Sequence, residues 1–184
     1  MPFDMNQVYQ PDADTYLLLD AARAEVRPGD RVLEIGTGSG LIAVELTRIA
    51  GVIATDINPH AVYCTKKKGV DVVQSDLFCG IRGLFDLILF NPPYLPTRPE
   101  ERIDDWLEYA LNGGETGRLV IGRFAEHVGK VLAPGGRILL LISSLTGLPE
   151  VRDLFFRSGF KSQILGKKLV EGETLYVLKM IRLG

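Results

Sequence analysis

The chain has 184 residues, 46% of them hydrophobic and 24% charged, with a net charge of −2. This length and composition are typical of one globular domain spanning residues 1–184, and the slight acidity disfavours a broad basic surface for nucleic acid. No apolar run approaches the ~20 residues of a membrane span, and Met1-Pro2-Phe3-Asp4 lacks the features of a secretion signal. We therefore predict a cytoplasmic protein without a membrane partner.

The chain contains two cysteines, Cys64 and Cys79, and two histidines, His60 and His127. Their spacing fits no zinc site, so no metal is predicted. We expect the cysteines to pack in the interior of a protein from a reducing compartment, with a disulfide as the alternative.

The first motif is Tyr9-Gln10-Pro11-Asp12-Ala13-Asp14-Thr15, which precedes an apolar helix predicted over residues 16–26. Asp14 or Thr15 is expected to be the N-cap of this helix. The segment is also suited to fold over a ligand and close its site to water.

Short strand patterns then alternate with helical patterns, which is typical of a parallel sheet covered on both faces. The expected strands cover residues 31–35, 52–56, 70–74, 85–90 and 137–143, followed by two antiparallel strands at 160–165 and 174–181. The expected helices are 41–50 with Ile42, Leu46 and Ile49 buried, Asn58-Pro59 to Gly69, a stripe from Ile121 through Val131 ending at Pro134-Gly135-Gly136, and Pro149 to Ser158-Gly159. The fold class is therefore α/β: a doubly wound, mostly parallel seven-stranded sheet, Rossmann-like, with a C-terminal antiparallel pair.

A glycine loop, Glu34-Ile35-Gly36-Thr37-Gly38-Ser39-Gly40, joins the first strand to the next helix. Glycines there allow a tight turn, close approach of the backbone to a ligand, and packing of the helix on the strand. The spacing is G-x-G-x-G with leucine at position 41, not the dinucleotide pattern G-x-G-x-x-G, which disfavours NAD.

Three carboxylates stand at successive strand ends: Glu34, Asp56 and Asp76. The carboxyl ends of parallel strands form the ligand-binding edge of such a sheet. Two like charges 4 Å apart repel by about 4 kcal/mol at an effective dielectric of 20, so this edge disfavours a pyrophosphate and suits a cation. S-adenosylmethionine carries a sulfonium and an ammonium, and its ribose hydroxyls and adenine amino group are donors to carboxylates. We assign Asp56 to the ribose, Asp76 with the Leu77 backbone to the adenine edge, and Glu34 to the methionine end or to the loop. For each of these acidic residues taken alone, the alternative is a role as a helix cap or turn residue.

Asn91-Pro92-Pro93-Tyr94 follows the apolar run 84–90 and is suited to hold a planar NH2 group by both of its hydrogens. Asn91 offers a side-chain carbonyl to one hydrogen, and the two prolines fix the backbone so that the carbonyl of Asn91 or Pro92 can accept the other. Tyr94 supplies a flat face for stacking. Asn91 is not a base, so we expect catalysis by alignment, which contributes roughly 7 to 11 kcal/mol. The alternative is a proline-rich strand exit.

Residues 95–117 form a long irregular stretch, which we interpret as a substrate-facing lid that is partly helical over 103–111. It contains Glu100-Glu101-Arg102, Trp106 and Gly113-Gly114. The alternative is a surface insertion that Trp106 anchors to the core.

Taken together, Tyr9-x-Pro11-x-x-Asp14-Thr15, Glu34-x-Gly36-x-Gly38-x-Gly40, Asp56, Asp76 and Asn91-Pro92-Pro93-Tyr94 resemble the HemK-type protein glutamine N5-methyltransferases. The likeness spans nearly the whole chain and is greatest to the short archaeal and eukaryotic branch that modifies class I release factors. It implies methylation of the glutamine side chain of a Gly-Gly-Gln motif, with S-adenosylmethionine as cofactor and S-adenosylhomocysteine as product. The family's cofactor contacts fall here on Thr15, Glu34, Gly36, Asp56, Asp76, Leu77 and Asn91.

The bacterial branch carries an extra N-terminal helical domain for its substrate, for which this chain has no room. Similar short enzymes work with a small zinc-binding activator protein that covers an apolar edge, and we expect such a partner beside the release factor. The main rival is a nucleic-acid amino methyltransferase, because adenine N6 and guanine N2 are also planar NH2 groups. The acidic composition and the lack of a base-flipping target domain disfavour it. A methyltransferase-like scaffold and a nicotinamide dehydrogenase are more distant alternatives.

Overall fold

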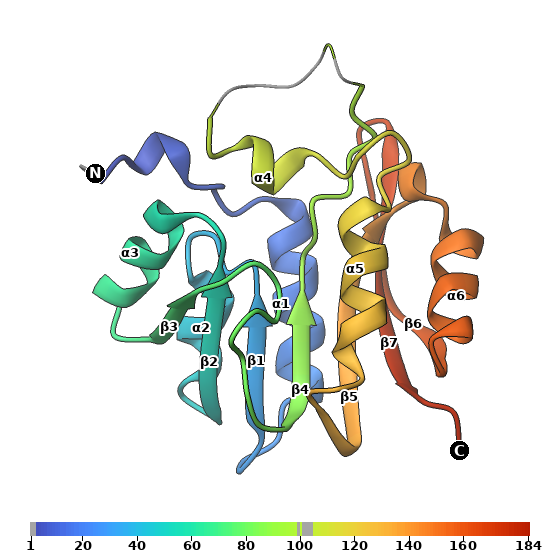
Figure 1. Cartoon of the computed structure of the whole chain (residues 1–184), viewed down its shortest axis with the longest axis horizontal. Helices are drawn as coiled ribbons and strands as arrows, with labels where there is room; N and C mark the ends of the chain where they lie inside the picture. The colour runs from blue at the N-terminus through green and yellow to red at the C-terminus, as the bar shows by residue number, and fades with distance from the viewer. Residues whose placement is uncertain (1–2, 99, 101–104) are drawn as a thin grey trace.

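A seven-stranded sheet in the order β3-β2-β1-β4-β5-β7-β6 forms the centre of the protein (Figure 1). The computed structural model describes residues 3–98, 100 and 105–184. The strands are β1 (Arg31–Ile35), β2 (Gly51–Asp56), β3 (Asp71–Gln74), β4 (Phe85–Phe90), β5 (Leu132–Ser143), β6 (Phe160–Val170) and β7 (Glu173–Arg182). Strands β1 to β5 pair in parallel, and β7 pairs antiparallel with both β5 and β6. The predicted fold class is confirmed.

Helices cover both faces of this sheet (Figure 1). They are α1 (Ala13–Glu25), α2 (Leu41–Leu46), α3 (Pro59–Lys67), α4 (Glu108–Leu111), α5 (Leu119–Val128) and α6 (Leu148–Arg157), with 3-10 turns η1 (Met5–Gln7) and η3 (Ser144–Thr146). In β1, Val32 packs with α1 and α2 on one face, and Leu33 packs with α5 and α6 on the other. Successive strand residues point to opposite faces, so a strand buried on both sides is apolar throughout. None of the described helices combines the length and hydrophobicity that crossing a bilayer demands.

The N-cap of α1 is Asp12, and the prediction of Asp14 or Thr15 was wrong. Asp12 has extended dihedrals (φ −133°, ψ −168°), and its side chain accepts a hydrogen bond from the Ala13 backbone at 2.6 Å. Asp14 and Thr15 lie in the first turn and are buried. A residue of a capping type whose side chain is engaged elsewhere in the fold does not cap the helix, and a neighbouring residue of a capping type does so instead.

Two helix ends also differ from expectation. Helix α2 stops at Leu46, before the predicted end at residue 50, because β2 already begins at Gly51 and a turn must lie between them. Ile49, predicted to be buried, is 39% exposed. Val131 lies beyond the end of α5, although it is buried in the same core, and its carbonyl accepts from the backbone of Phe85 at 2.9 Å.

Strands β5 and β6 are longer than predicted because they contain irregularities that a periodic pattern hides. In β5, Leu132 pairs with Phe85 and Arg137 with Leu87, so the intervening Pro134-Gly135-Gly136 bulges within the strand. A register shift between Ile164 and Gly166 lets β6 continue pairing with β7 to the end of the hairpin.

The cysteines and the predicted lid give mixed outcomes. Both cysteines are free; Cys64 is buried as expected, whereas Cys79 is exposed. Within the stretch 95–117, residues 99 and 101–104 lie outside the described residues, and with them Glu101-Arg102 and the start of the predicted helix 103–111. Of the described residues 105–111 of that predicted helix, 108–111 are helical, as α4, and 105–107 form a bend and a turn.

Candidate active site

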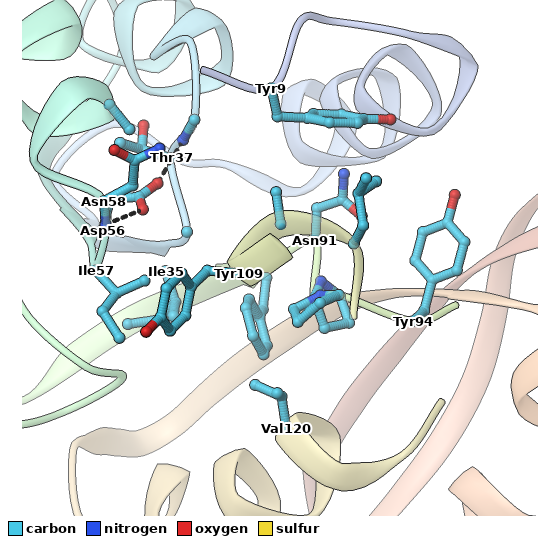
Figure 2. A pocket seen from close by; sticks show the side chains of 18 of the residues that line it. Tyr9, Ile35, Thr37, Asp56, Ile57, Asn58, Asn91, Tyr94, Tyr109 and Val120 are labelled. Carbon is cyan, nitrogen blue, oxygen red and sulfur yellow. Dashed lines mark hydrogen bonds between the residues drawn. The ribbon is translucent and has the colours of Figure 1, made fainter. Parts of the chain in front are cut away.

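A cavity of about 330 Å³ lies at the carboxyl ends of β1, β2 and β4, and the N-terminal segment around Tyr9 forms one of its walls (Figure 2). All the predicted site residues except Gly40 line it. They are Thr15, Glu34, Gly36, Gly38, Asp56, Asp76, Leu77, Asn91, Pro92 and Tyr94. Strands β1 and β4 are neighbours, so the glycine loop and the Asn91 motif face each other across the topological switch point.

Gly40 serves helix packing and does not line the cavity. It has a positive φ of 80° at the start of α2, and a Cβ there would lie 2.6 Å from the Thr65 Oγ1. This glycine lets α2 begin against α3, whereas Gly36 and Gly38 bring the backbone to the cavity wall.

Asp56 holds the glycine loop in place from the end of β2 (Figure 2). Its Oδ2 accepts from the backbone of Gly38 at 2.8 Å, and its Oδ1 accepts from the backbone of Asn58 at 2.9 Å. Burial raises the pKa of Asp56 above its ordinary value, while these backbone hydrogen bonds lower it. Each oxygen retains a lone pair that can accept from a ligand hydroxyl.

Glu34 is buried on the cavity wall, at the same 4% exposure as Asp14. Burial raises its pKa to about 8, against hydrogen bonds from the Thr37 hydroxyl and the Ala43 backbone, and the charge of Asp56 raises it further. The Thr37 hydroxyl donates to its Oε2 at 2.7 Å. A buried acidic group with so high a pKa gives up its proton when a cation enters, which suits a positively charged ligand.

Asp76 differs from Glu34 and Asp56 because it lies on the rim of the cavity. Its side chain is 45% exposed, and its Oδ2 lies 2.7 Å from the Nη2 of Arg123 on α5. The crowding of three carboxylates expected from the sequence is therefore relieved by a cation from a distant helix. The next residue, Leu77, lines the cavity. Its φ of 49° lies in the left-handed region, which is strained for leucine.

Asn91 stands at the end of β4 with its carboxamide fixed. Its Nδ2 donates to the Oδ2 of Asp14 at 3.0 Å, and the Tyr9 hydroxyl donates to the same oxygen at 2.9 Å. The Asn91 Oδ1 is buried and has no hydrogen-bond partner among the residues that the structure describes. A buried carbonyl left without a donor is costly, so this acceptor is suited to a ligand N–H.

The turn that follows Asn91 is supported by glycines that sequence reasoning left without a role. A Cβ at Gly113 would lie 2.9 Å from the Pro93 carbonyl oxygen, and one at Gly117 would lie 2.3 Å from that of Tyr94. The backbone of Gly113 also donates to the Leu95 carbonyl at 2.9 Å. The cluster Gly113-Gly114 followed by Gly117 was the sequence feature from which this close packing could have been predicted.

The described part of the 95–117 stretch reaches the cavity through Trp106 and Tyr109, whose ring centroids lie 5.3 Å apart. The Trp106 backbone donates to the Gln7 Oε1 at 2.9 Å, and the Gln7 carbonyl accepts from the Asn58 Nδ2 at 2.6 Å. The N-terminal segment thus connects the aromatic pair to the strand end that carries Asp56.

The chemistry of this cavity fits S-adenosylmethionine. Acidic groups on one side match its cationic centres, and an unpartnered carbonyl on the other side is ready to hold a second molecule. In the described ranges 3–98, 100 and 105–184, no three histidine, cysteine, aspartate or glutamate side chains are grouped as a metal site would require.

Comparison with known proteins agrees with this chemistry. Residues 7–104 match the family described as methyltransferase small domain. The chain is 40% identical to a Methanocaldococcus jannaschii protein with the provisional name protein N5-glutamine methyltransferase, over 96% of this chain and 93% of that protein. It is 34% identical to the human methyltransferase HEMK2, over 96% of this chain and 91% of the human protein.

A solved structure is similar as well. It is a chain of the E. cuniculi Mtq2–Trm112 complex, described as responsible for methylation of the eRF1 translation termination factor. The TM-score is 0.82 at 32% identity, and the match covers 96% of this chain and 99% of that one. The family match and these full-length relatives show that the chain belongs to the methyltransferase small domain family, within the S-adenosylmethionine-dependent protein glutamine N5-methyltransferases of the HemK type.

Proposed function

We propose that this enzyme methylates the side-chain amide nitrogen of a glutamine in the Gly-Gly-Gln motif of a class I release factor. The observation that carries the proposal is the buried, unpartnered Oδ1 of Asn91 on the cavity wall. It is an acceptor placed for one N–H of a primary amide. The names of the M. jannaschii and E. cuniculi relatives support glutamine and a termination factor as the target.

We assign the cofactor contacts by chemistry and position. Asp56 accepts from the ribose hydroxyls, and Asp76 with the Leu77 backbone holds the adenine edge. Glu34 and Thr15 lie toward the methionine end, where Glu34 is ionised by the ligand's positive charge. Gly36 and Gly38 allow the backbone to approach the ligand closely.

The catalytic step is an in-line substitution. S-adenosylmethionine supplies an electrophilic methyl group. The amide nitrogen forms a bond to the methyl carbon while the carbon–sulfur bond breaks, its electron pair stays on sulfur, and the surplus N–H proton passes to water. Asn91 and the Pro92 carbonyl hold the two hydrogens, and Tyr94 stacks on the amide plane. Their contribution is orientation, which is worth roughly 7 to 11 kcal/mol, far above the ~1 kcal/mol of an ordinary hydrogen bond.

Residues 95–117 are proposed to face the substrate protein, since Trp106 and Tyr109 present aromatic surface at the cavity. A small zinc-binding activator subunit is proposed to cover the edge strand β3, where Val73 is 46% exposed and β2 is the one neighbour among the described strands. The Mtq2–Trm112 pairing of the E. cuniculi relative supports such a partner. Release factors act on cytoplasmic ribosomes, so a cytoplasmic location accompanies this proposal.

The test is incubation with isotope-labelled S-adenosylmethionine and either a class I release factor or RNA, followed by mass spectrometry of the products. We expect one methyl group on the glutamine of the Gly-Gly-Gln motif. Label in RNA and none in the factor would refute the proposal. Full turnover by the isolated chain, unchanged by an added partner, would remove the activator subunit from it.

The role of Asn91 is tested separately. Asn91→Ala should lower turnover by about 100-fold or more while the affinity for S-adenosylmethionine is nearly kept, because the lost acceptor faces the substrate. The exposed Asn6, which lies outside the cavity, provides the matched Asn6→Ala control. An N91A enzyme with the turnover of N6A would exclude Asn91 from the reaction.

A further inference from the structure

Asp14 is a buried carboxylate on which four hydrogen-bond donors converge. Its Oδ2 accepts from the Asn91 Nδ2 at 3.0 Å and from the Tyr9 hydroxyl at 2.9 Å. Its Oδ1 accepts from the backbone N–H of Thr15 at 2.5 Å and from the Thr15 hydroxyl at 3.2 Å. The burial of Tyr9 and then the charge of Asp14 raise the pKa of Tyr9 above its ordinary range, so its hydroxyl stays a donor.

The carboxylate determines which end of the Asn91 carboxamide faces the cavity. The two ends of an amide have nearly the same shape and opposite hydrogen-bonding character. Because both oxygens of Asp14 accept hydrogen bonds and neither donates one, the NH2 of Asn91 must face Asp14. The carbonyl Oδ1 then lies buried on the cavity wall, and no group in the described part of the chain donates to it.

We infer that Asp14 is a positioning residue that turns the Asn91 carbonyl toward the substrate and thereby selects a glutamine amide over a glutamate carboxylate. This inference rests on the proposed function. Glutamine and glutamate side chains have nearly the same size, so shape cannot separate them. An acceptor fixed in the cavity attracts an NH2 group and repels a carboxylate oxygen, and sites built on such hydrogen bonds reject an analogue by about 10⁴-fold.

The informative variant is D14N, which keeps the shape of the side chain and reverses its hydrogen bonds. The Thr15 backbone N–H can only donate, so the carbonyl of the new amide must remain on that side. Its NH2 then faces Asn91, whose carboxamide must turn to accept and will present its own NH2 to the cavity. The hydroxyls of Tyr9 and Tyr94, which both interact with Asp14, can accept in place of donating, so the fold is retained.

We expect D14N to turn over a Gly-Gly-Gln peptide about 100-fold more slowly, with its affinity for S-adenosylmethionine unchanged. Competition binding in the presence of S-adenosylhomocysteine provides a readout that does not depend on turnover. The wild type should prefer the glutamine peptide over the matching glutamate peptide, and D14N should lose or invert this preference. D20N, on the exposed face of the same helix, is the matched control and should behave as the wild type.

A transposed pair keeps the inference testable if D14N folds poorly. In D14N/N91D the amide at position 14 donates to a carboxylate at position 91, which again presents an acceptor to the cavity. Turnover of the glutamine peptide should recover at least 10-fold over D14N. The reason is that Asp14 acts only by determining which end of the residue 91 side chain faces the cavity.

The outcomes separate the inference from the function. Absence of transfer to glutamine by the wild type rejects the proposed function. Transfer by the wild type with equal turnover and peptide preference in D14N rejects only the role of Asp14. A D14N variant that loses cofactor affinity as much as turnover also rejects it, since Asp14 would then act on the cofactor. Failure of the transposed pair to recover any turnover counts against it in the same way.

Discussion

Gly117 packs so closely against the carbonyl oxygen of Tyr94 that a Cβ at position 117 would lie 2.3 Å from it. The segment after α4 therefore lies directly against the Asn-Pro-Pro-Tyr turn, and a parallel bridge between Leu95 and Asn112 continues the contact. The two prolines fix their own dihedral angles, but the direction in which the turn presents Tyr94 depends on this later segment.

Replacing Gly117 with alanine should therefore impair both folding and turnover. The residue has a φ of 69°, so any side chain adds roughly 1 to 2 kcal/mol of backbone strain before the contact with Tyr94 is counted. Gly159 has a φ of 87° and no atom within 4 Å of an added Cβ, so G159A isolates the strain. We expect G117A to lose more free energy of unfolding in urea than G159A, and to be the only one of the two with reduced methyl transfer. Equal losses of stability with unchanged turnover in both would show that the contact does not position Tyr94.

Local chemistry was sufficient to predict most of the fold. Asn58 caps α3 with Pro59 at its first position, and Phe85 to Phe90 is bounded as predicted because buried parallel strands are apolar throughout. The glycine loop and the strand-end acids were likewise found by their local spacing.

The missed features depend on contacts between distant segments. From the sequence alone, Asp14 is predicted to be a helix cap, and only the fold shows its contact with Asn91. Arg123 has the pattern of an ordinary charged residue on a helix, and only the fold places it beside Asp76. The meaning of Gly117 depends on the Tyr94 carbonyl. No periodicity or spacing within one segment carries such information.

The rim pair of Asp76 and Arg123 should affect ligand binding more than stability. Both side chains are about half exposed, and such pairs contribute about 0 to 1 kcal/mol to folding. If Asp76 holds the adenine edge, D76A should weaken S-adenosylmethionine binding by about 10-fold in calorimetry, the equivalent of one good hydrogen bond. R123A leaves the carboxylate in place and should weaken binding less. Equal losses in both variants would instead place Arg123 itself against the ligand.

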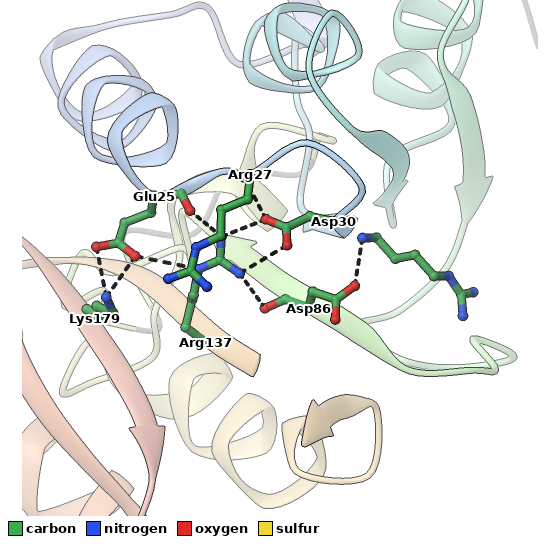
Figure 3. Close-up of polar contacts among 7 residues, drawn as sticks. Glu25, Arg27, Asp30, Asp86, Arg137 and Lys179 are labelled. Atoms are coloured by element: carbon green, nitrogen blue, oxygen red, sulfur yellow. Dashed lines mark hydrogen bonds and ion pairs between the residues drawn. The ribbon is translucent and has the colours of Figure 1, made fainter. Parts of the chain in front are cut away.

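The end of the sheet opposite the cavity contains a buried ion network around Arg137 (Figure 3). The Arg137 Nη2 lies 2.6 Å from the Asp30 Oδ2, and its Nε lies 3.5 Å from the Glu25 Oε2, which Lys179 also contacts at 2.8 Å. Burial opposes the ionisation of Asp30, but hydrogen bonds from Arg137 and the Arg27 backbone lower its pKa below the ordinary value. These contacts connect the end of α1, the loop before β1, and strands β5 and β7.

Replacing Arg137 with methionine should destabilise the protein by about 3 to 5 kcal/mol, because the largely buried Asp30 carboxylate loses its counter-charge, whereas Glu25 keeps Lys179. The exposed pair of Arg157 and Asp153 on α6 provides the control, and R157M should change the free energy of unfolding by less than about 0.5 kcal/mol. Urea unfolding monitored by circular dichroism distinguishes them. Because the network is remote from the cavity, folded R137M should bind S-adenosylmethionine as the wild type does; a small effect on stability would mean that water already solvates these charges.

The pH dependence of stability should report the proton on Glu34. Its pKa is about 8 in the folded protein, mainly through burial, against an ordinary value of 4.5 that applies to the unfolded chain. Between pH 5 and pH 8 the folded state therefore holds a proton that the unfolded state has lost. The free energy of unfolding must fall as the pH rises through this window, at a slope of up to about 1.4 kcal/mol per pH unit for one proton.

Glu34→Gln removes this titration and keeps an acceptor for Thr37. The fall in the free energy of unfolding between pH 5 and pH 8 should therefore become less steep, by up to one proton equivalent. It should not vanish, because burial raises the pKa of Asp56 in the same direction. Glu45, whose pKa is lowered by its hydrogen bond with Arg23, titrates below this window, so E45Q should leave the slope unchanged. Urea denaturation at half-unit pH intervals measures all three slopes. An E34Q slope equal to that of the wild type would mean that Glu34 is already ionised in the ligand-free protein, and that cofactor binding does not have to expel its proton.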